Sequence, residues 1–379
     1  MEKVCNPTSL SRYSSSTFSD CVFDIKSPNT PIVLDSDLNF VTSYTQDTIH
    51  FTAGEHFYLK CPSGTTSTII SEIGDLVVCI GGVRFYHTGL GKELFFDKLG
   101  CKDVQPAHAL RQLDQPCANN FTTIQLGIEV NYTFIPEFLV CFDTVHLVPF
   151  YAEFSKTSYD CHVEDACDDK YNYFVDAGDL YGVDLDLLYQ EAGDILQDLA
   201  PFNISYTQLV PKRYFLNPAQ WYPTFDYVNF VFSWVPYSWF SPYSFCTNYL
   251  EVGSVIYNGV LGVSANKNDE GEYVNLYLFN GTVPIPKWYW CVFYDVAPEV
   301  DGRFYIDFGT PYSSIPEAEL KDWWNTELCI ADTFDYIEEG TFFYGNCTFE
   351  EVINPQLQNF IDFKWPGART VPTTTTTPS

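Results

Sequence analysis

The stretch YFLNPAQWYPTFDY, residues 214–227, has the layout of a loop that leads into an active site. An aromatic lead-in is followed by loop-forming prolines and then by residues that could start a helix or strand. Its central side chains, Pro218, Ala219 and Gln220, nevertheless supply no general base, no nucleophile and no strong metal ligand. The segment is therefore either a site of unfamiliar chemistry or a site that has lost its chemistry.

A second group of candidate functional residues lies in an acidic segment, residues 160–198, with twelve Asp and Glu residues and one Lys. Within it, DACDDKYNYFVDAGD offers carboxylates for calcium but lacks the glycine and the spacing of an EF-hand loop. The alternative is a surface helix with a solvated acidic side, starting after a possible N-cap at Asp184. Its apolar face would consist of Leu185, Leu188, Ala192, Ile195, Leu196 and Leu199.

The charge of the chain argues against a nucleic-acid partner. Its 379 residues contain 19 Lys and Arg and 49 Asp and Glu, which gives a formal net charge of −30. Nucleic-acid binders gain affinity when Lys and Arg displace counterions from phosphates, and this sequence has no Lys/Arg cluster. The acidity could instead serve solubility or bind cations diffusely. Hydrophobic residues make up 46% and aromatic residues 18%, which predicts a large core rich in β-sheet.

Thirteen cysteines predict disulfide bonds and therefore an oxidising, extracellular location. None forms a CxxC pair or lies at zinc-ligand spacing with a histidine. The odd number leaves one thiol free or bonded to another chain. The cysteines are Cys5 and twelve disulfide candidates, Cys21, Cys61, Cys79, Cys101, Cys117, Cys141, Cys161, Cys167, Cys246, Cys291, Cys329 and Cys347.

Five N-x-S/T sequons agree with a secreted glycoprotein, at Asn120, Asn131, Asn203, Asn280 and Asn346. No apolar run is long enough to span a membrane. The first residues, MEKVCNPTSL, lack the apolar core of a signal peptide. We therefore expect a mature secreted chain with an added or residual Met1.

The elements that would position these residues suggest five parts. An N-terminal extension, residues 1–20, precedes a β-rich domain over residues 21–158, where short apolar runs alternate with turns. An acidic connector, residues 159–182, leads to a second domain over residues 183–364. There, GVLGVSANKNDEGEYVNLYLF predicts a hairpin and IPKWYWCVFYD a long buried strand. Residues 365–379 form a Thr/Pro-rich tract typical of a mucin-like stalk or linker.

Several of these segments, in this order, resemble the arthropod secreted DNA/RNA non-specific endonucleases. The first half of the likeness rests on ALRQLDQPC, TTIQLGIEVNYTFIPEFLVCFD and FYAEFSKT. The second half rests on VDLDLLYQEAGDILQ, YFLNPAQWYPTFDY, GVLGVSANKNDEGEYVNLYL, VPIPKWYWCVFYD, LCIADTF and GNCTFEEVINPQL. The likeness covers roughly residues 21–357. It implies an α+β fold, with a ββα-metal nuclease domain preceded by a β-rich N-terminal domain and stapled by disulfides.

The resemblance implies hydrolysis of phosphodiesters by a histidine general base and a magnesium ion, with the histidine in an Arg-Gly-His-Leu motif. Aligning the flanks at Tyr214 to Leu216 and at Pro223 places Pro218, Ala219, Gln220 and Trp221 on that motif. An alternative register from Arg213 places Phe215 on the histidine. Neither register supplies a base, because a glutamine amide stays neutral and cannot take a proton from water. Loss of a general base removes a contribution of roughly 10²–10⁴ in rate.

The metal-binding block implied by the resemblance is also degenerate in FVFSWVPYSWFSPYSFCTNYLE. Aligned at Pro236, Ser233 replaces the first asparagine and Tyr237 the glutamine, and the metal-binding asparagine falls near Pro242 or Tyr243. Asn248 and Glu251 are the remaining candidate ligands. The six histidines, His50, His56, His87, His108, His146 and His162, all precede the nuclease-like half, although one could reach over from the first domain.

Two functions follow from these residues. The first is a secreted glycosylated pseudo-nuclease without cofactor, which binds an extracellular partner, associates with itself or helps to build an extracellular matrix. The alternative is a magnesium-dependent non-specific endonuclease, or a nucleic-acid-binding protein without turnover, from the same family.

Overall fold

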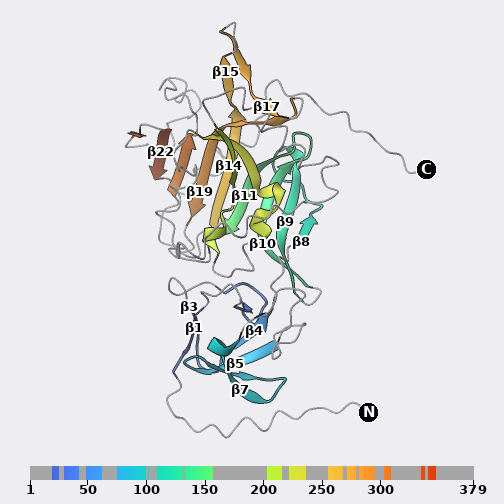
Figure 1. The fold of residues 1–379 in the computed structure, drawn as a ribbon, viewed down its shortest axis with the longest axis vertical. Helices are drawn as coiled ribbons and strands as arrows, with labels where there is room; N and C mark the ends of the chain where they lie inside the picture. Colours follow the sequence, from blue (N-terminus) through green and yellow to red (C-terminus); the bar gives the residue numbers. More distant parts are fainter. Residues whose placement is uncertain are drawn as a thin grey trace, which may run out of the picture. The chain divides into compact units, whose positions relative to one another are not determined.

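The structure is a computed structural model that describes the chain in segments (Figure 1). The chain divides into two compact units, residues 1–105 and residues 106–379, and each is described by itself. The described residues are 19–24, 30–41, 48–61, 75–99, 101, 109–130, 133–156, 203–215, 222–235, 255–267, 271–278, 281–294, 303–308, 334–337 and 340–346.

The first unit consists of two antiparallel sheets. The five-stranded sheet has the order β2 (Ile32–Leu34), β4 (His56–Lys60), β5 (Asp75–Gly81), β6 (Arg84–His87) and β7 (Lys92–Phe95). A two-stranded sheet pairs β1 (Cys21–Asp24) with β3 (Thr48–Phe51), and the 3-10 turn η1 (Phe96–Lys98) follows β7. Along β5 the alternate residues Val77 and Cys79 are buried, as expected for a strand with one face on a core.

A cluster of phenylalanines forms the core of the first unit. The Phe23 ring lies 4.4 Å from the Phe96 ring, and the Phe51 ring lies 4.2 Å from the Phe57 ring, both measured between centroids of stacked pairs. Phe85 packs edge-on against Phe23 and Phe57. Such large buried rings supply much of the apolar burial that a unit of this size needs.

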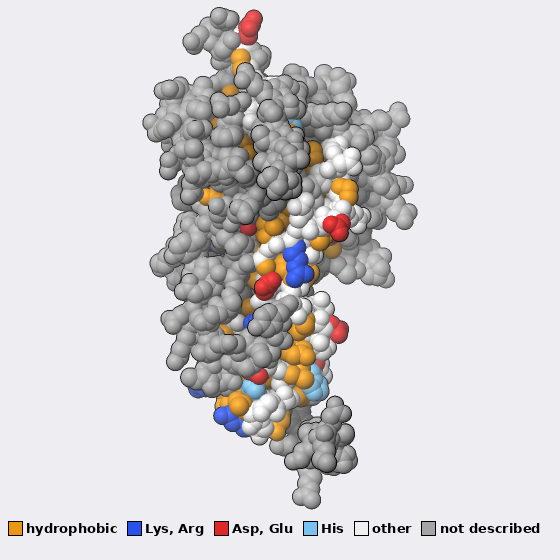
Figure 2. All heavy atoms as spheres, turned by 90° about the vertical axis from the view of Figure 1, so that its right-hand side faces the viewer, with side chains coloured by type: hydrophobic (Ala, Val, Ile, Leu, Met, Phe, Trp, Pro, Cys, Tyr) orange, Lys and Arg blue, Asp and Glu red, His pale blue; other side chains and the backbone are white. Residues whose placement is uncertain are grey.

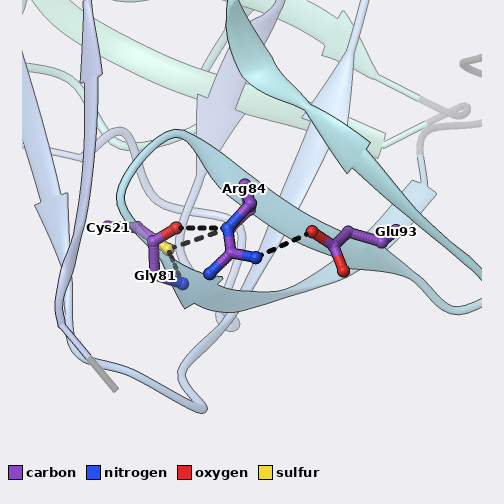
Figure 3. A network of polar contacts seen from close by, with 4 residues as sticks. All are labelled: Cys21, Gly81, Arg84 and Glu93. Carbon is purple, nitrogen blue, oxygen red and sulfur yellow. Dashed lines mark hydrogen bonds and ion pairs between the residues drawn. The ribbon is translucent and has the colours of Figure 1, made fainter. Parts of the chain in front are cut away.

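Two disulfides close this unit, Cys21–Cys79 between β1 and β5 and Cys61–Cys101. Figure 3 shows the contacts beside the first: the Gly81 N–H donates to Cys21 Sγ over 3.3 Å, and Arg84 Nε donates to the Gly81 carbonyl oxygen over 3.4 Å. Arg84 also pairs with Glu93 at 3.1 Å. Gly81 has φ +121°, and a Cβ there would come within 2.8 Å of the Ser19 carbonyl oxygen, so this position requires glycine.

The second unit is built on one nine-stranded antiparallel sheet, seen from green to red-brown in Figure 1. In sheet order its strands are β21 (Phe334–Ile337), β22 (Gly340–Asn346), β20 (Arg303–Phe308), β19 (Pro286–Tyr294), β14 (Val255–Val263), β11 (Val148–Ser155), β10 (Thr133–Asp143), β9 (Thr122–Val130) and β8 (Ala109–Gln112). A third disulfide, Cys117–Cys141, ties the η2 turn (Ala118–Asn120) to β10.

A β-bulge interrupts β10 where its pairing with β9 shifts between Pro136 and Phe138. Proline cannot donate to the ladder, and Pro136 lies at this bulge, before the residues of β10 that pair with β11. The opposite position must be glycine, because a Cβ on Gly127 would lie 2.1 Å from the Ile135 carbonyl oxygen.

One face of the nine-stranded sheet is buried over its central strands β9, β10, β11 and β14. Its residues on β9, β10, β11 and β14 are Ile124, Leu126, Phe138, Val140, Ala152, Phe154, Ile256 and Asn258, all at most 3% exposed. β12 (Asn203–Gln208) and β13 (Phe230–Val235) form a two-stranded ribbon. Aromatic rings from the segment between these two strands pack against the buried face of the large sheet. Two short ribbons complete the described part, β15 (Ala265–Lys267) with β16 (Tyr273–Asn275) and β17 (Tyr277–Leu278) with β18 (Val283–Pro284).

The predicted β-rich character, the predicted hairpin after residue 267 and the predicted strand in IPKWYWCVFYD are confirmed. The described residues contain 3-10 turns and no α-helix, so they show the β part of the α+β prediction and not a ββα-metal domain. The predicted helix and the calcium candidate, in residues 160–198, lie outside the described residues. Strands from residues 109–155 and 255–346 share one sheet, and the two compact units meet at residues 105/106. The domain bounds expected from the sequence stay predictions.

Candidate functional site

Tyr214 and Phe215, the lead-in to residues 216–221, pack against the buried face of the large sheet. Tyr214 ends the 3-10 turn η5 (Lys212–Tyr214), and its ring stacks on Phe154 of β11 at 5.3 Å. Phe215 stacks on Phe138 of β10 at 6.3 Å. Both side chains are buried, so burial of aromatic area fixes where the chain enters residues 216–221.

The chain that leaves residues 216–221 is fixed by two consecutive 3-10 turns, η6 (Tyr222–Phe225) and η7 (Tyr227–Asn229). The side chain of Asp226 caps the second turn, because its Oδ1 accepts the Val228 N–H over 3.0 Å. Thr224, Asp226 and Asn229 are all completely buried. Residues 222–229 are therefore held in place by polar groups inside the protein.

Buried amide side chains tie the two sides of the loop together. Asn229 Nδ2 donates to the carbonyl oxygens of Val210 and Thr224, over 3.0 and 2.8 Å, and Asn229 Oδ1 accepts the Val210 N–H over 2.9 Å. Gln208 Nε2 donates to the same Thr224 carbonyl oxygen over 2.8 Å. Asn258 Nδ2, from β14, donates to the Leu209 carbonyl oxygen over 2.6 Å. These hydrogen bonds hold residues 208–210 against residues 224–229 and β14, but the amides can neither take nor give a proton in a reaction.

A buried lysine also lies beside the lead-in. Lys156, which follows β11, is 2% exposed, and its Nζ lies 5.7 Å from the centre of the Tyr214 ring. At this distance the ring face attracts the ammonium group, and this contributes to keeping the cation in the interior.

The residues predicted from the resemblance are not brought together by the described part of the structure. Pro218, Ala219 and Gln220 lie outside the described residues, and so do Tyr237, Asn248 and Glu251. Ser233 lies in β13, where its backbone is in register with Ser205 of β12. The degenerate motif and metal block therefore stay predictions from the sequence.

Four of the six histidines are described, three of them in the first unit. His50 and His56 are exposed strand residues of the first unit. His87 is buried there: its Nδ1 accepts the Leu90 N–H over 3.1 Å and its Nε2 lies 3.2 Å from Asp75 Oδ2. His108 and His162 lie outside the described residues.

The ring of His146 also faces a carboxylate, an arrangement found in catalytic histidines. His146 Nδ1 lies 2.5 Å from Oδ2 of Asp143, and Asp143 Oδ1 accepts the N–H groups of Val145 and His146. The pair occupies the turn between β10 and β11. Phe154, against which the lead-in packs, is near the other end of β11, about 20 Å away along a strand. The pair therefore caps a turn rather than serving residues 214–215.

A second polar cluster, which the sequence did not single out, lies on the opposite, half-buried face of the large sheet. Tyr151 and Glu153 are two residues apart on β11 and so share a face, and Glu153 is paired in register with Tyr257 of β14. The Glu153 carboxylate accepts a hydrogen bond from the Tyr257 hydroxyl. Burial raises the pKa of Glu153, although this hydrogen bond lowers it; burial and then the charge of Glu153 raise the pKa of Tyr151.

The described residues contain no group of three or more His, Cys, Asp or Glu side chains that could hold a metal ion. Figure 2 shows that, among the described side chains on the face it draws, Lys and Arg occur as separated groups. No helix in the described part of the chain is long and apolar enough to cross a membrane.

The predicted disulfides are confirmed for six of the twelve candidates, and three disulfides indicate that the chain folds in an oxidising environment such as the extracellular space. Cys291 lies in β19, and Cys161, Cys167, Cys246, Cys329 and Cys347 lie outside the described residues, as does Cys5.

Of the sequons, Asn120 is exposed in the η2 turn, where a glycan could be attached. Asn203 begins β12 and Asn346 ends β22. Asn131 and Asn280 lie outside the described residues. Glycosylation at all five positions stays a prediction.

No protein-family model matches the chain, and no curated protein matches its sequence.

Proposed function

We propose that this chain is a secreted, disulfide-bonded glycoprotein that keeps a nuclease-like scaffold without nuclease chemistry and acts by binding an extracellular partner or by building extracellular material. Two observations carry the proposal: the residues that flank positions 216–221 are held by buried side chains, and the sequence of these positions contains no base. Buried rings and amides fix both sides of residues 216–221, whereas Pro218, Ala219 and Gln220 offer nothing that transfers a proton.

The charge distribution supports the same proposal. A net charge of −30 opposes association with phosphate backbones, and the described Lys and Arg side chains in Figure 2 do not form a continuous surface. The disulfides, the exposed sequon at Asn120 and the Thr/Pro tract fit an extracellular role.

The alternative, a nuclease or a nucleic-acid binder that needs magnesium, derives its support from the ordered sequence resemblance alone. Magnesium prefers carboxylate, amide and water oxygens, and Ser233 and Tyr237 at the expected ligand positions fit this preference poorly.

One assay separates the two functions. The full chain, purified from a secreting cell line, is incubated at low salt with plasmid DNA and with double-stranded RNA, with magnesium or with a chelator. A family member that retains the histidine is the positive control, and heat-denatured chain is the negative control. We expect no cleavage above the negative control, whereas magnesium-dependent cleavage would refute the proposal. A gel shift that weakens steeply with salt would support the nucleic-acid-binding alternative.

A further inference from the structure

Tyr151, Glu153 and Tyr257 form a compact polar cluster on the half-buried face of the large sheet. β11 and β14 bring them together, because Glu153 pairs with Tyr257, and Tyr151 pairs with Gly259. The Tyr151 and Tyr257 ring centroids are 6.2 Å apart, and the ring planes are tilted by 57°. The two rings thus lie side by side at an angle, and the carboxylate of Glu153 lies on the same face of the sheet.

The carboxylate in this cluster has a hydrogen bond but no described counter-ion. It accepts a hydrogen bond from the Tyr257 hydroxyl. The ion pairs of Asp75, Glu93, Asp97 and Asp143 do not involve it. Burial disfavours its charged form, and a neighbouring cation would remove that penalty. Two ring faces add attraction for the same cation, because aromatic faces carry negative charge density.

We propose that Tyr151, Glu153 and Tyr257 bind the ammonium or guanidinium group of a Lys or Arg side chain presented by a basic polypeptide partner. The net charge of −30 is complementary to such a partner and would speed its approach. This inference rests on the proposed binding role and names the chemistry of the partner. A neutral sugar could stack on one ring, but it would leave the charge of Glu153 uncompensated.

The test measures binding of a short dye-labelled oligolysine peptide to the intact, full-length chain, by fluorescence anisotropy at physiological salt. Screening at that salt suppresses the long-range effect of the net charge, so that local contacts dominate the differences between variants. Glu153→Gln removes the carboxylate charge from the cluster. Glu129→Gln is the matched control, because Glu129 is an exposed residue of β9 in the same sheet, and the substitution changes the net charge equally.

We expect Glu153→Gln to weaken binding about tenfold, as loss of one partly desolvated charge contact implies, and Glu129→Gln to change it less than about twofold. Tyr151→Ala should also weaken binding severalfold, whereas Tyr257→Phe, which keeps the ring, should weaken it less. Circular dichroism of each variant verifies that it is folded. Equal effects of Glu153→Gln and Glu129→Gln, or equal binding of a lysine-acetylated peptide, would overturn the inference.

Failure of this inference and failure of the proposed function can be told apart. Absence of site-specific peptide binding in a chain that does not cleave nucleic acid would refute the inference and leave the non-catalytic role in place. Magnesium-dependent cleavage would refute the proposed function, whatever the peptide measurement gives.

Discussion

Asn229 and Val210 are joined by two hydrogen bonds inside the protein: the side-chain amide donates to the Val210 carbonyl oxygen over 3.0 Å and accepts the Val210 N–H over 2.9 Å. The Asn229 amide group thereby pairs with both backbone polar groups of Val210, as a residue on a neighbouring β-strand would. It links the turn after residues 216–221 to the segment before them, and both residues are completely buried. The residues on either side of 216–221 are thus joined by a side chain that has no catalytic chemistry.

Replacing this side chain should destabilise the second unit. Asn229→Ala leaves the N–H and carbonyl groups of Val210 without their buried partner and removes one donor to Thr224, so we expect the free energy of unfolding to fall by about 3 kcal/mol. Denaturant unfolding followed by tryptophan fluorescence measures the change. Gln112→Ala, on the exposed end of β8, is the control and should change stability by less than about 0.5 kcal/mol. Equal losses in the two variants would show that the network does not stabilise the fold.

The turn between β10 and β11 offers a second test, which decides whether Asp143 has a structural role. Asp143→Ala removes the acceptor of two backbone N–H groups and the partner of His146, and should lower the free energy of unfolding by about 2 kcal/mol. Asp143→Asn keeps an oxygen that can accept both N–H groups and should lose less. If Asp143→Asn lowers the free energy of unfolding as much as Asp143→Ala, the hydrogen bonds to the two backbone N–H groups are not the source of the stability that Asp143 supplies.

The sequence predicts much of the local β structure and little of its assembly. Alternation of apolar and polar residues in TTIQLGIEV and VPFYAEFS identifies strands, and the turn residues after Lys267 identify a hairpin. The pairing of β11 with β14 could not be predicted, because the two strands are about a hundred residues apart and their sequences carry no register signal.

The same limit explains why the Tyr151–Glu153–Tyr257 cluster was missed. Tyr151 and Glu153 read as the polar side of an ordinary strand, and Tyr257 joins them through pairing across the domain boundary that the sequence suggested. The buried polar network was missed for a similar reason, since Asn229 and Asn258 have no sequence pattern that marks them as buried. The cysteine count did predict disulfides, but the three pairings come from the structure.

The cysteine pairing leads to a prediction about assembly. Six of the thirteen cysteines form three intrachain disulfides, so an odd number, seven, remains. We expect thiol titration of the unfolded, unreduced chain to find an odd number of free thiols per monomer, or else a disulfide-linked dimer on a non-reducing gel. Mass spectrometry of unreduced peptides should recover the pairs Cys21–Cys79, Cys61–Cys101 and Cys117–Cys141. Recovery of any of these six cysteines in a different pair would contradict the structure.

Glu153 should make stability depend on pH in a defined direction. Because burial raises the pKa of its carboxyl in the folded chain, folding favours the protonated form. The stability that this group contributes is present at low pH and is lost as the pH rises through the folded pKa. Glu153→Gln should therefore be more stable than the natural chain at about pH 7, by less than about 1 kcal/mol for a half-buried group, with the difference shrinking towards about pH 4.

The comparison of the two proteins across pH is made by denaturant unfolding at fixed salt. Glu129→Gln controls for the relief of general charge repulsion in so acidic a chain. The stability difference between Glu153→Gln and the natural chain could stay constant with pH, or could match that of Glu129→Gln at every pH. Either result would mean that burial does not disfavour the charged form of Glu153.

The proposal that this chain does not cleave nucleic acid is tested most directly by the cleavage rate of a quenched double-stranded oligonucleotide under single-turnover conditions. The full chain is followed across the chromatographic peak, in magnesium and in chelator. We predict that the cleavage activity does not coelute with the protein. In magnesium, the cleavage rate of the native chain should equal that of the heat-denatured chain. Cleavage that requires magnesium, coelutes with the chain and changes in the Gln220→Ala variant would contradict the account.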